Sequence, residues 1–215
     1  MTFYSEAQRV AAANLDERLE EMDRFFMKEG KVHTTLRRLA RRLEGENIPY
    51  AIIGGMALFL HGFARETLDV DLILTPEGLE KFRDKFIGSG YLPAFTGALK
   101  TFKDTASNVK VEIITTGEDP GGKPGPIVFP DPETASVERE GIQVIVLEKL
   151  IELKLISGLT ASYRLRDLAD VQDLIIYLGL PLEFAEQLDQ SVQAEYRRLW
   201  ELAQHAGEGP HEREP

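Results

Sequence analysis

Two aspartates, Asp69 and Asp71, stand one residue apart in an otherwise apolar run. Successive side chains on a β-strand point to opposite faces, so the two carboxylates would project from one face, about 7 Å apart. Leu68, Val70 and Leu72 would then point into a core. Carboxylates this close repel each other unless a cation compensates, and Mg²⁺ is held through such oxygens with positions left open for substrate phosphates. The aspartate pair therefore predicts a magnesium site.

A glycine pair, Gly54 and Gly55, precedes the aspartates and is expected to open a short helix over residues 54–60. The first N–H groups of a helix lack partners within it and the helix dipole is positive there, so a phosphate is favoured at this end. The glycines and the aspartates would lie on adjacent elements. A metal site beside a phosphate-binding turn indicates phosphoryl or nucleotidyl transfer.

Three further candidate residues lie between the glycines and the aspartates. Arg65 could clamp a phosphate or a base, because its planar guanidinium binds oxygens in bidentate fashion, or it could neutralise Asp69 or Glu66. Thr67 could hydrogen-bond the aspartates, but its place at the start of a strand favours a conformational role. For His61, packing beneath the glycine turn is favoured over catalysis.

A second group of charged residues lies between residues 147 and 175. Lys154 stands among leucines and isoleucines in a predicted helix, and a lysine in so apolar a setting needs an anion nearby. Arg166 and Asp170 are four residues apart on the next predicted helix, where an ion pair is expected. These charges predict either a salt-bridged helix that packs on the sheet or a further part of the site.

The apolar pattern predicts the secondary structure. Strands are expected over residues 50–53, 68–74, 99–103, 109–114 and 142–146. Helices are expected over residues 5–27, 31–45, 54–60, from Pro76 to near Gly88, 147–156, 165–178 and 182–203. This order predicts an α+β fold, in which helices flank a mixed β-sheet and a helical portion follows at the C-terminal end.

The same pattern divides the chain into four parts. N-terminal helices over residues 1–46 would pack on a core at 47–146, C-terminal helices would occupy 147–204, and a tail at 205–215 is expected to be disordered. Within the core, residues 117–132 hold five prolines and four glycines. This composition predicts an ordered loop or lid beside the site.

The charge balance constrains the partners. With 25 basic and 36 acidic residues the net charge is −11, and nucleic-acid affinity depends on neutralising phosphates, so a general nucleic-acid binder is not expected. A local patch for RNA would have to come from residues 28–31 and 37–42, where a solvated helix face is the favoured interpretation. The chain has no cysteine, no signal-peptide pattern and no apolar run long enough for a bilayer. We therefore expect a cytoplasmic protein that does not bind membranes.

The segment GGMALFLHGFARETLDVDL, residues 54–72, resembles the nucleotidyltransferase fold of the polymerase β superfamily. It is most similar to small bacterial stand-alone nucleotidyltransferases, including those of the abortive-infection toxin type, with which it shares the glycine pair, the arginine, the threonine and Asp-x-Asp. The resemblance extends over residues 33–178. It implies a nucleoside triphosphate (NTP) as substrate and Mg²⁺ as cofactor, with a two-metal site expected.

The resemblance also implies roles for individual residues of the core. Gly54 and Gly55 would contact the triphosphate, and Asp69 and Asp71 would ligate Mg²⁺. Glu112 matches the position of the third metal ligand and general base. The family more often has aspartate there, and the longer glutamate would shift the base or hold one metal loosely.

The remaining assignments are carried over by position. Lys154 would contact the triphosphate, and Asp170, with Asp167, would orient that lysine or the acceptor. The predicted nucleotide-binding set is completed by Arg65, Thr67 and Arg166. Asp104 is a weaker substitute for the third carboxylate, because it falls where a hairpin turn is expected.

Together these features predict a Mg²⁺-dependent nucleotidyltransferase that moves a nucleoside monophosphate from an NTP to the hydroxyl of an RNA end, a protein or a small molecule such as an aminoglycoside. The acidic charge disfavours RNA and favours a cationic small molecule. The alternative is a non-catalytic nucleotide- or partner-binding module of a toxin–antitoxin-like system. An antitoxin-like protein and a second copy of the chain are the candidate protein partners.

Overall fold

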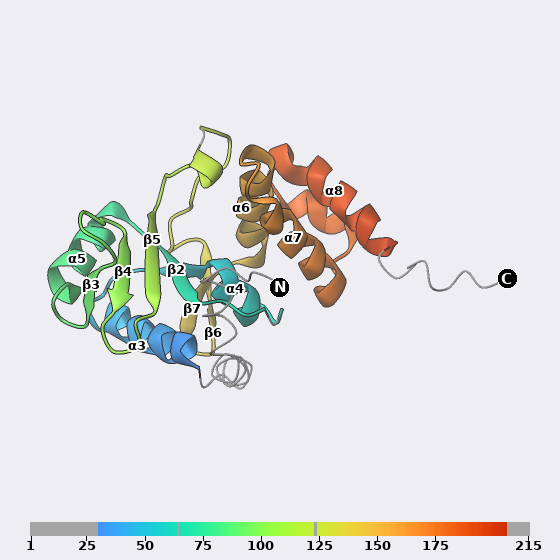
Figure 1. Cartoon of the computed structure of the whole chain (residues 1–215). Coiled ribbons are helices and arrows are strands. Elements are labelled where there is room, and N and C mark those ends of the chain that lie inside the picture. Colours follow the sequence, from blue (N-terminus) through green and yellow to red (C-terminus); the bar gives the residue numbers. More distant parts are fainter. Residues whose placement is uncertain (1–29, 64, 123, 206–215) are drawn as a thin grey trace, which may run out of the picture.

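In the computed structural model, residues 30–63, 65–122 and 124–205 are described, and they form a seven-stranded sheet with helices around it (Figure 1). The strands are β1 (Ala51–Ile53), β2 (Asp69–Leu74), β3 (Tyr91–Pro93), β4 (Thr101–Asp104), β5 (Lys110–Thr115), β6 (Ser136–Arg139) and β7 (Ile142–Ile145). They lie in the order β3-β4-β5-β2-β1-β7-β6. The pairs β1–β7 and β2–β5 are parallel, and the other neighbours are antiparallel. The predicted α+β class with a mixed sheet is confirmed.

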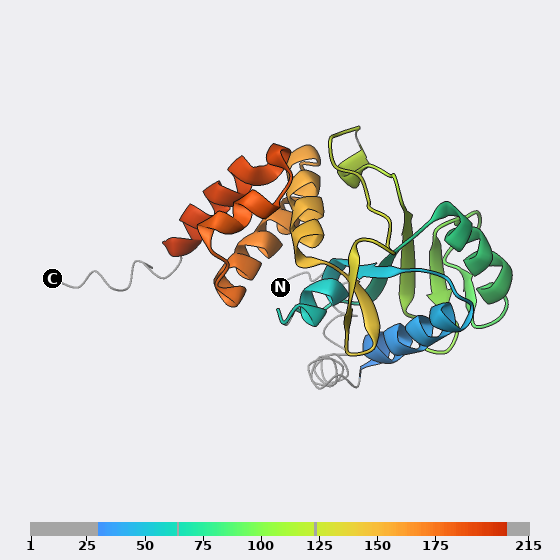
Figure 2. The same ribbon diagram turned by 180° about the vertical axis from the view of Figure 1, so that it is seen from behind.

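The helices form two groups. They are α3 (Lys31–Gly45), α4 (Gly54–Leu60), α5 (Pro76–Phe86), α6 (Leu147–Thr160), α7 (Leu165–Leu178) and α8 (Gln190–Gln204), with 3₁₀ turns η1 (Pro120–Gly122) and η2 (Leu182–Gln187). Both views show α3 and α5 against the sheet, whereas α6, α7 and α8 gather in a bundle beside it (Figures 1 and 2). No helix within the described residues is long and apolar enough to cross a membrane.

Several predicted elements are confirmed to the residue, namely α3, α4 and α7. On α3 the apolar residues recur at helical spacing and are buried in the core: Val32, Leu36, Leu39, Ala40 and Leu43. The start of α5 is also confirmed, because the N–H of Gly78 donates to the Thr75 hydroxyl oxygen at 3.0 Å and Pro76 occupies the first turn. The predicted helix over residues 5–27 and residues 206–215 of the predicted tail lie outside the described residues.

Two strands were not predicted, and both are edge strands. β3 and β6 lie at opposite ends of the sheet, where one side of the strand has no neighbouring strand in the described sheet. Four of their seven residues are exposed, so neither has the apolar alternation that marks a strand. The hairpin formed by β4 and β5 was predicted, because its inward-facing residues are buried.

Several predicted boundaries are wrong, and the strand expected over residues 99–103 spans Thr101–Asp104. Leu68 was expected to point into the core, but β2 begins at Asp69 and the Leu68 side chain is 74% exposed. The helix expected over residues 182–203 is divided into η2 and α8, because Asp189 turns the chain and caps α8 by accepting from the Ser191 N–H at 2.9 Å. The helix predicted over residues 147–156 continues to Thr160.

Candidate functional site

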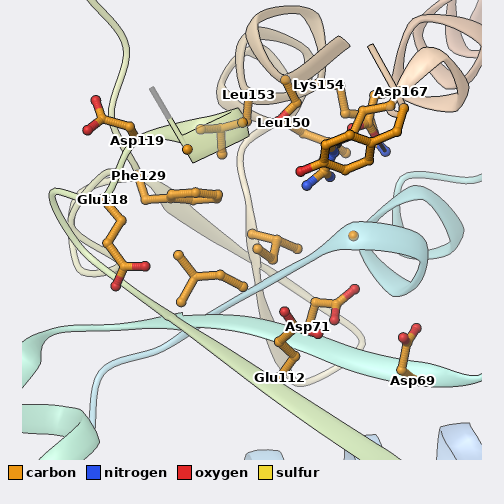
Figure 3. A pocket seen from close by; sticks show the side chains of 18 residues that line it. Asp69, Asp71, Glu112, Glu118, Asp119, Phe129, Leu150, Leu153, Lys154 and Asp167 are labelled. Carbon is orange, nitrogen blue, oxygen red and sulfur yellow. Dashed lines mark hydrogen bonds and ion pairs between the residues drawn. The ribbon is translucent and has the colours of Figure 1, made fainter. Parts of the chain in front are cut away.

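Three carboxylates predicted from the sequence lie on the neighbouring strands β2 and β5. Asp71 is paired directly with Glu112 across the two strands, and Asp69 is two residues before Asp71 on the same face. We call Asp69, Asp71 and Glu112 the acidic cluster. All three line one pocket of about 380 Å³ (Figure 3). The strand register therefore brings together residues that are more than forty positions apart in the chain.

Asp71 is the carboxylate of the cluster that most needs a cation. Burial and the negative charges of Asp69 and Glu112 raise the pKa of Asp71 to about 7, although Lys110 and Lys154 act in the opposite direction. Within the described residues, the Asp71 carboxylate makes no hydrogen bond or ion pair. A bound cation would relieve this repulsion.

Lys110 contacts the cluster and was not among the predicted site residues. Its Nζ lies 3.2 Å from Asp69 Oδ2 and 2.9 Å from Glu112 Oε2. Burial lowers the pKa of Lys110, but its hydrogen bonds with Glu112 and Asp69 outweigh this effect and raise the pKa above its ordinary value. A signal was present in the sequence, because Lys110 precedes Glu112 by two positions and must share its face of the strand.

The glycine pair is required by close packing against β2. Gly54 has φ +65°, and a β-carbon there would overlap the carboxylate of Asp71. A β-carbon on Gly55 would lie 2.6 Å from Thr67 Cβ. Gly54 lines the pocket and Gly55 does not, and the nucleotide contact expected for both stays a prediction. Thr67 precedes β2 rather than beginning it, and its hydroxyl donates to Asp69 Oδ1 at 2.9 Å, so it orients one carboxylate.

The second group of charged residues forms a connected network beside the pocket. Lys154 Nζ lies 2.6 Å from Asp170 Oδ2 and 3.1 Å from Asp167 Oδ1. Arg65 Nη1 lies 2.6 Å from Asp170 Oδ1, and Arg164 Nε lies 2.6 Å from Asp167 Oδ2. We call these five residues the cationic network, because three cations and two carboxylates leave a net charge of +1. The expected anion for Lys154 is thus confirmed, and Lys154 lines the pocket.

Two predicted members of the site lie elsewhere. The ion pair expected between Arg166 and Asp170 is not formed, because Asp170 is buried and binds Arg65 and Lys154, whereas Arg166 is exposed at the start of α7 and does not line the pocket. Arg65 does not line the pocket either. It neutralises Asp170 rather than the expected Asp69 or Glu66, so its contact with the site passes through the cationic network.

His61 and Asp104 have structural contacts. The Nε2 atom of His61 lies 2.7 Å from the carbonyl oxygen of Ile145, which agrees with the packing role that the sequence favoured. Asp104 is buried away from the pocket, and its side chain accepts hydrogen bonds from the N–H of Ala106 at 2.8 Å and from Arg38. Asp104 therefore holds the hairpin turn and is no substitute for Glu112.

The basic residues of α3 are engaged in structural contacts too. Arg38 binds Asp104, and Arg37 lies 3.6 Å from Glu140. The guanidinium of Arg42 lies 4.2 Å from the centre of the Phe86 ring and donates to the carbonyl oxygen of Ser89. These contacts agree with the favoured interpretation of a helix face, and residues 28 and 29 lie outside the described residues.

The proline- and glycine-rich segment borders the pocket, as predicted. Its two arms are joined at their base, where Gly117 N–H donates to the Phe129 carbonyl at 2.8 Å and Phe129 N–H donates to the Glu118 carbonyl at 2.9 Å. The turn η1 packs on α6, where a β-carbon on Gly121 would overlap Thr160. Both contacts hold the described parts of the segment against the pocket, whereas residue 123 lies outside the described residues.

This loop adds an apolar wall to the pocket, which the sequence did not predict. The Phe129 ring points into the pocket on the side where α6 passes (Figure 3). The wall consists of Ile53, Ile114, Phe129, Leu150 and Leu153. The pocket thus has acidic residues from strands, cationic residues from the helical part and an apolar wall.

The donor set of the acidic cluster fits a divalent cation. Among the residues that the structure describes, no three Asp, Glu or His side chains already enclose a metal position. Mg²⁺ does not require such a cage, since it keeps several waters and is held by one or two carboxylates together with substrate phosphates. Asp71 supplies an unpaired carboxylate for this purpose, with Asp69 and Glu112 beside it.

Solved structures resemble this fold. An antigenic nucleotidyltransferase-like protein from Paracoccidioides brasiliensis is 22% identical, over 81% of this chain and 88% of that chain, with a TM-score of 0.51. The described chain has a nucleotidyltransferase-like fold. A proposed nucleotidyltransferase from Thermotoga maritima is 22% identical, over 64% of this chain and 91% of that chain, with a TM-score of 0.43. Another from H. pylori is 17% identical, over 85% of this chain and 96% of that chain, with a TM-score of 0.45. No protein-family model and no curated protein matches the sequence.

Proposed function

We propose that this chain is a nucleotidyltransferase that moves a nucleoside monophosphate from an NTP to an acceptor hydroxyl. One observation carries the proposal: the in-register pair Asp71 and Glu112, with Asp69 on the same face, lies across a single pocket from Lys154 (Figure 3). Carboxylates that can hold a metal and a cation that can hold phosphate are the two groups that phosphoryl chemistry needs.

The acidic cluster would hold Mg²⁺ and handle the proton. A divalent cation bound there would neutralise charge on the phosphates and lower the pKa of the attacking hydroxyl. Lys110 occupies Glu112 Oε2, which leaves the other carboxylate oxygen of Glu112 to accept the hydroxyl proton. Thr67 keeps Asp69 in place through its hydrogen bond.

The cationic network would hold the triphosphate. The ammonium group of Lys154 has three donors, and two of them bind Asp167 and Asp170, so one remains for a phosphate oxygen. Arg65 and Arg164 balance the two aspartates and keep the network cationic. In this role Arg65 positions Lys154 through Asp170 rather than touching the nucleotide.

The apolar wall would take the nucleobase. Phe129 presents a ring to the pocket, and every base has a face that stacks on an aromatic ring. The wall lines the same pocket as the acidic cluster and Lys154. A nucleotide could therefore place its base on Phe129 with its phosphates between the two charged groups.

The proposal is tested with α-labelled NTPs and a cell extract. We expect Mg²⁺-dependent transfer of label to an acceptor, and we expect Asp71→Asn to reduce it by about 100-fold or more, because one carboxylate facing the reacting phosphate is lost. Asp104→Asn is the matched control, since this aspartate lies outside the pocket. Transfer that survives Asp71→Asn would overturn the proposal.

The alternative of a non-catalytic binding module makes a different prediction in the same assay. It requires Mg²⁺-dependent thermal stabilisation by an NTP without transfer of label. The contact between Lys110 and Glu112 favours this alternative, because it occupies one oxygen of the expected general base. The acceptor, a cognate antitoxin-like partner, a homodimer and a cytoplasmic location stay predictions from the sequence.

A further inference from the structure

Lys110 places its ammonium group between two members of the acidic cluster. Its Nζ lies 3.2 Å from Asp69 Oδ2 and 2.9 Å from Glu112 Oε2, so one cation bridges both carboxylates. The position is set by the sheet, because Lys110 is paired directly with Asp69 across β2 and β5 and Glu112 follows on the same face. The bridge is therefore built into the strand register.

The charges of the cluster can be counted from these contacts. The three carboxylates carry −3 when ionised and Lys110 carries +1, so −2 remains, which one divalent cation balances. Lys154 is the next cation within electrostatic reach of Asp71, but Asp167 and Asp170 already engage it. Without a nucleotide, a second divalent ion would enter a site that is already neutral.

The three carboxylates also differ in their contacts, and the difference agrees with this charge count. Asp69 and Glu112 each bind the lysine, whereas the Asp71 carboxylate has no hydrogen bond or ion pair within the described residues. One carboxylate is thus open to a metal while the outer two share a lysine. Lysine is a compact point charge on a flexible stem, so it can stand in for an ion at this place.

We propose that Lys110 is a positioning residue that acts as an internal cation and limits the acidic cluster to one divalent ion in the nucleotide-free protein. This inference rests on the metal site of the proposed function. It predicts one bound metal ion in the nucleotide-free protein, whereas a two-metal site was expected from the sequence. A second ion would arrive with the triphosphate, which brings its own negative charge.

The test counts Mn²⁺ ions bound to the full chain without nucleotide, by the electron paramagnetic resonance signal of the free ion. We expect one ion per chain for the wild type, two for Lys110→Met and one for Lys110→Arg, which keeps the charge. Lys110→Gln serves in the same way if Lys110→Met does not fold, as judged by circular dichroism. A merely structural lysine would not change the number of bound ions.

The outcomes separate this inference from the proposed function. If the wild type binds two ions, or if the neutral variants still bind one or bind none, the role of Lys110 is overturned while the metal site stands. Asp71→Asn should bind no Mn²⁺. If the wild type binds none, or Asp71→Asn binds as well as the wild type, the metal site of the proposed function fails and the inference fails with it.

Discussion

Two lysines, Lys110 and Lys154, each bridge a pair of carboxylates, and residues of both bridges line the same pocket. The bridge at Lys154 is buried, with side-chain exposures of 9% for the lysine and 11% and 4% for Asp167 and Asp170. The lysine of the other bridge is 40% exposed. The same chemical unit therefore occurs in two different dielectric environments.

The difference determines what each bridge can do. In a buried site, removing one charge leaves its partners without water to solvate them, so the ions stay together. At an exposed site, water and salt solvate the separated charges, and the pair contributes little to stability. The buried bridge is suited to hold Lys154 in one place, whereas the charges of the exposed bridge can be changed at little cost to stability.

The largest effect is expected at the buried bridge. Lys154→Met should lower the free energy of unfolding by about 3 kcal/mol, because Asp167 and Asp170 lose a cation that they share. Lys85→Met is the control, since Lys85 pairs with Glu46 at the surface, with side-chain exposures of 60% and 43%, and should contribute less than about 1 kcal/mol. Urea denaturation measures both. Equal losses would show that burial does not distinguish these lysines.

The apolar wall tests whether a nucleotide lies between the two bridges. Phe129→Ala should weaken NTP binding by about tenfold through the loss of base stacking, and should leave the binding of inorganic tripolyphosphate unchanged. Val128→Ala is the control, because Val128 is exposed and does not line the pocket. Isothermal titration calorimetry gives both affinities. An equal loss for tripolyphosphate would contradict a base site at Phe129.

Asp104 lies outside the pocket and serves as a reference carboxylate, because its ionisation makes the stability of the fold depend on pH. Burial would raise the pKa of Asp104, but hydrogen bonds from Ser107, Arg38 and Ala106 outweigh it and lower the pKa below its ordinary value of 3.8. Ionised Asp104 therefore stabilises the folded protein. This contribution is complete above pH 3.8 and is lost as the pH falls through the folded-state pKa of Asp104. Asp104→Asn should lower the free energy of unfolding by about 1 kcal/mol at neutral pH.

Comparing the wild type with Asp104→Asn over a series of pH values tests the direction of this effect on the free energy of unfolding. The difference between wild type and Asp104→Asn should shrink as the pH is lowered below 3.8, because Asp104 becomes protonated in the folded protein. Thermal unfolding at several pH values measures this difference. A gap that widens in acid would contradict the assignment of Asp104 to the hairpin turn.

The smallest effect on stability is expected at the exposed bridge. Lys110→Met should change the free energy of unfolding by less than about 1 kcal/mol, and added salt should reduce the change further. Denaturation in low and high salt measures it. A loss as large as that of Lys154→Met would remove the contrast between the two bridges.

Much of the fold follows from local patterns. The helices α3, α4 and α7 were predicted to the residue, because each buries one apolar stripe and ends near a glycine or a turn. The edge strands β3 and β6 were missed because exposed strands lack that pattern. Leu68 shows the converse error, in which an apolar residue at a strand end is exposed.

The candidate site was predicted in part. Local sequence was sufficient for the aspartate pair and for the glycine turn, since alternation along a strand and the start of a helix are short-range features. It also indicated that Lys154 needs an anion. The partners of Asp170 could not be found this way, because Arg65 lies 105 residues earlier in the chain and Arg166, four residues away, is exposed.

The sequence by itself determined which side chains face the same way on each element, because the periods of strands and helices are properties of the backbone. It therefore specified Asp69 with Asp71, and Lys110 with Glu112. Only the tertiary structure decided that β2 and β5 pair with Asp71 beside Glu112 and Asp69 beside Lys110. Register depends on contacts between distant segments, and a shift of one residue would turn one set of charges to the opposite face.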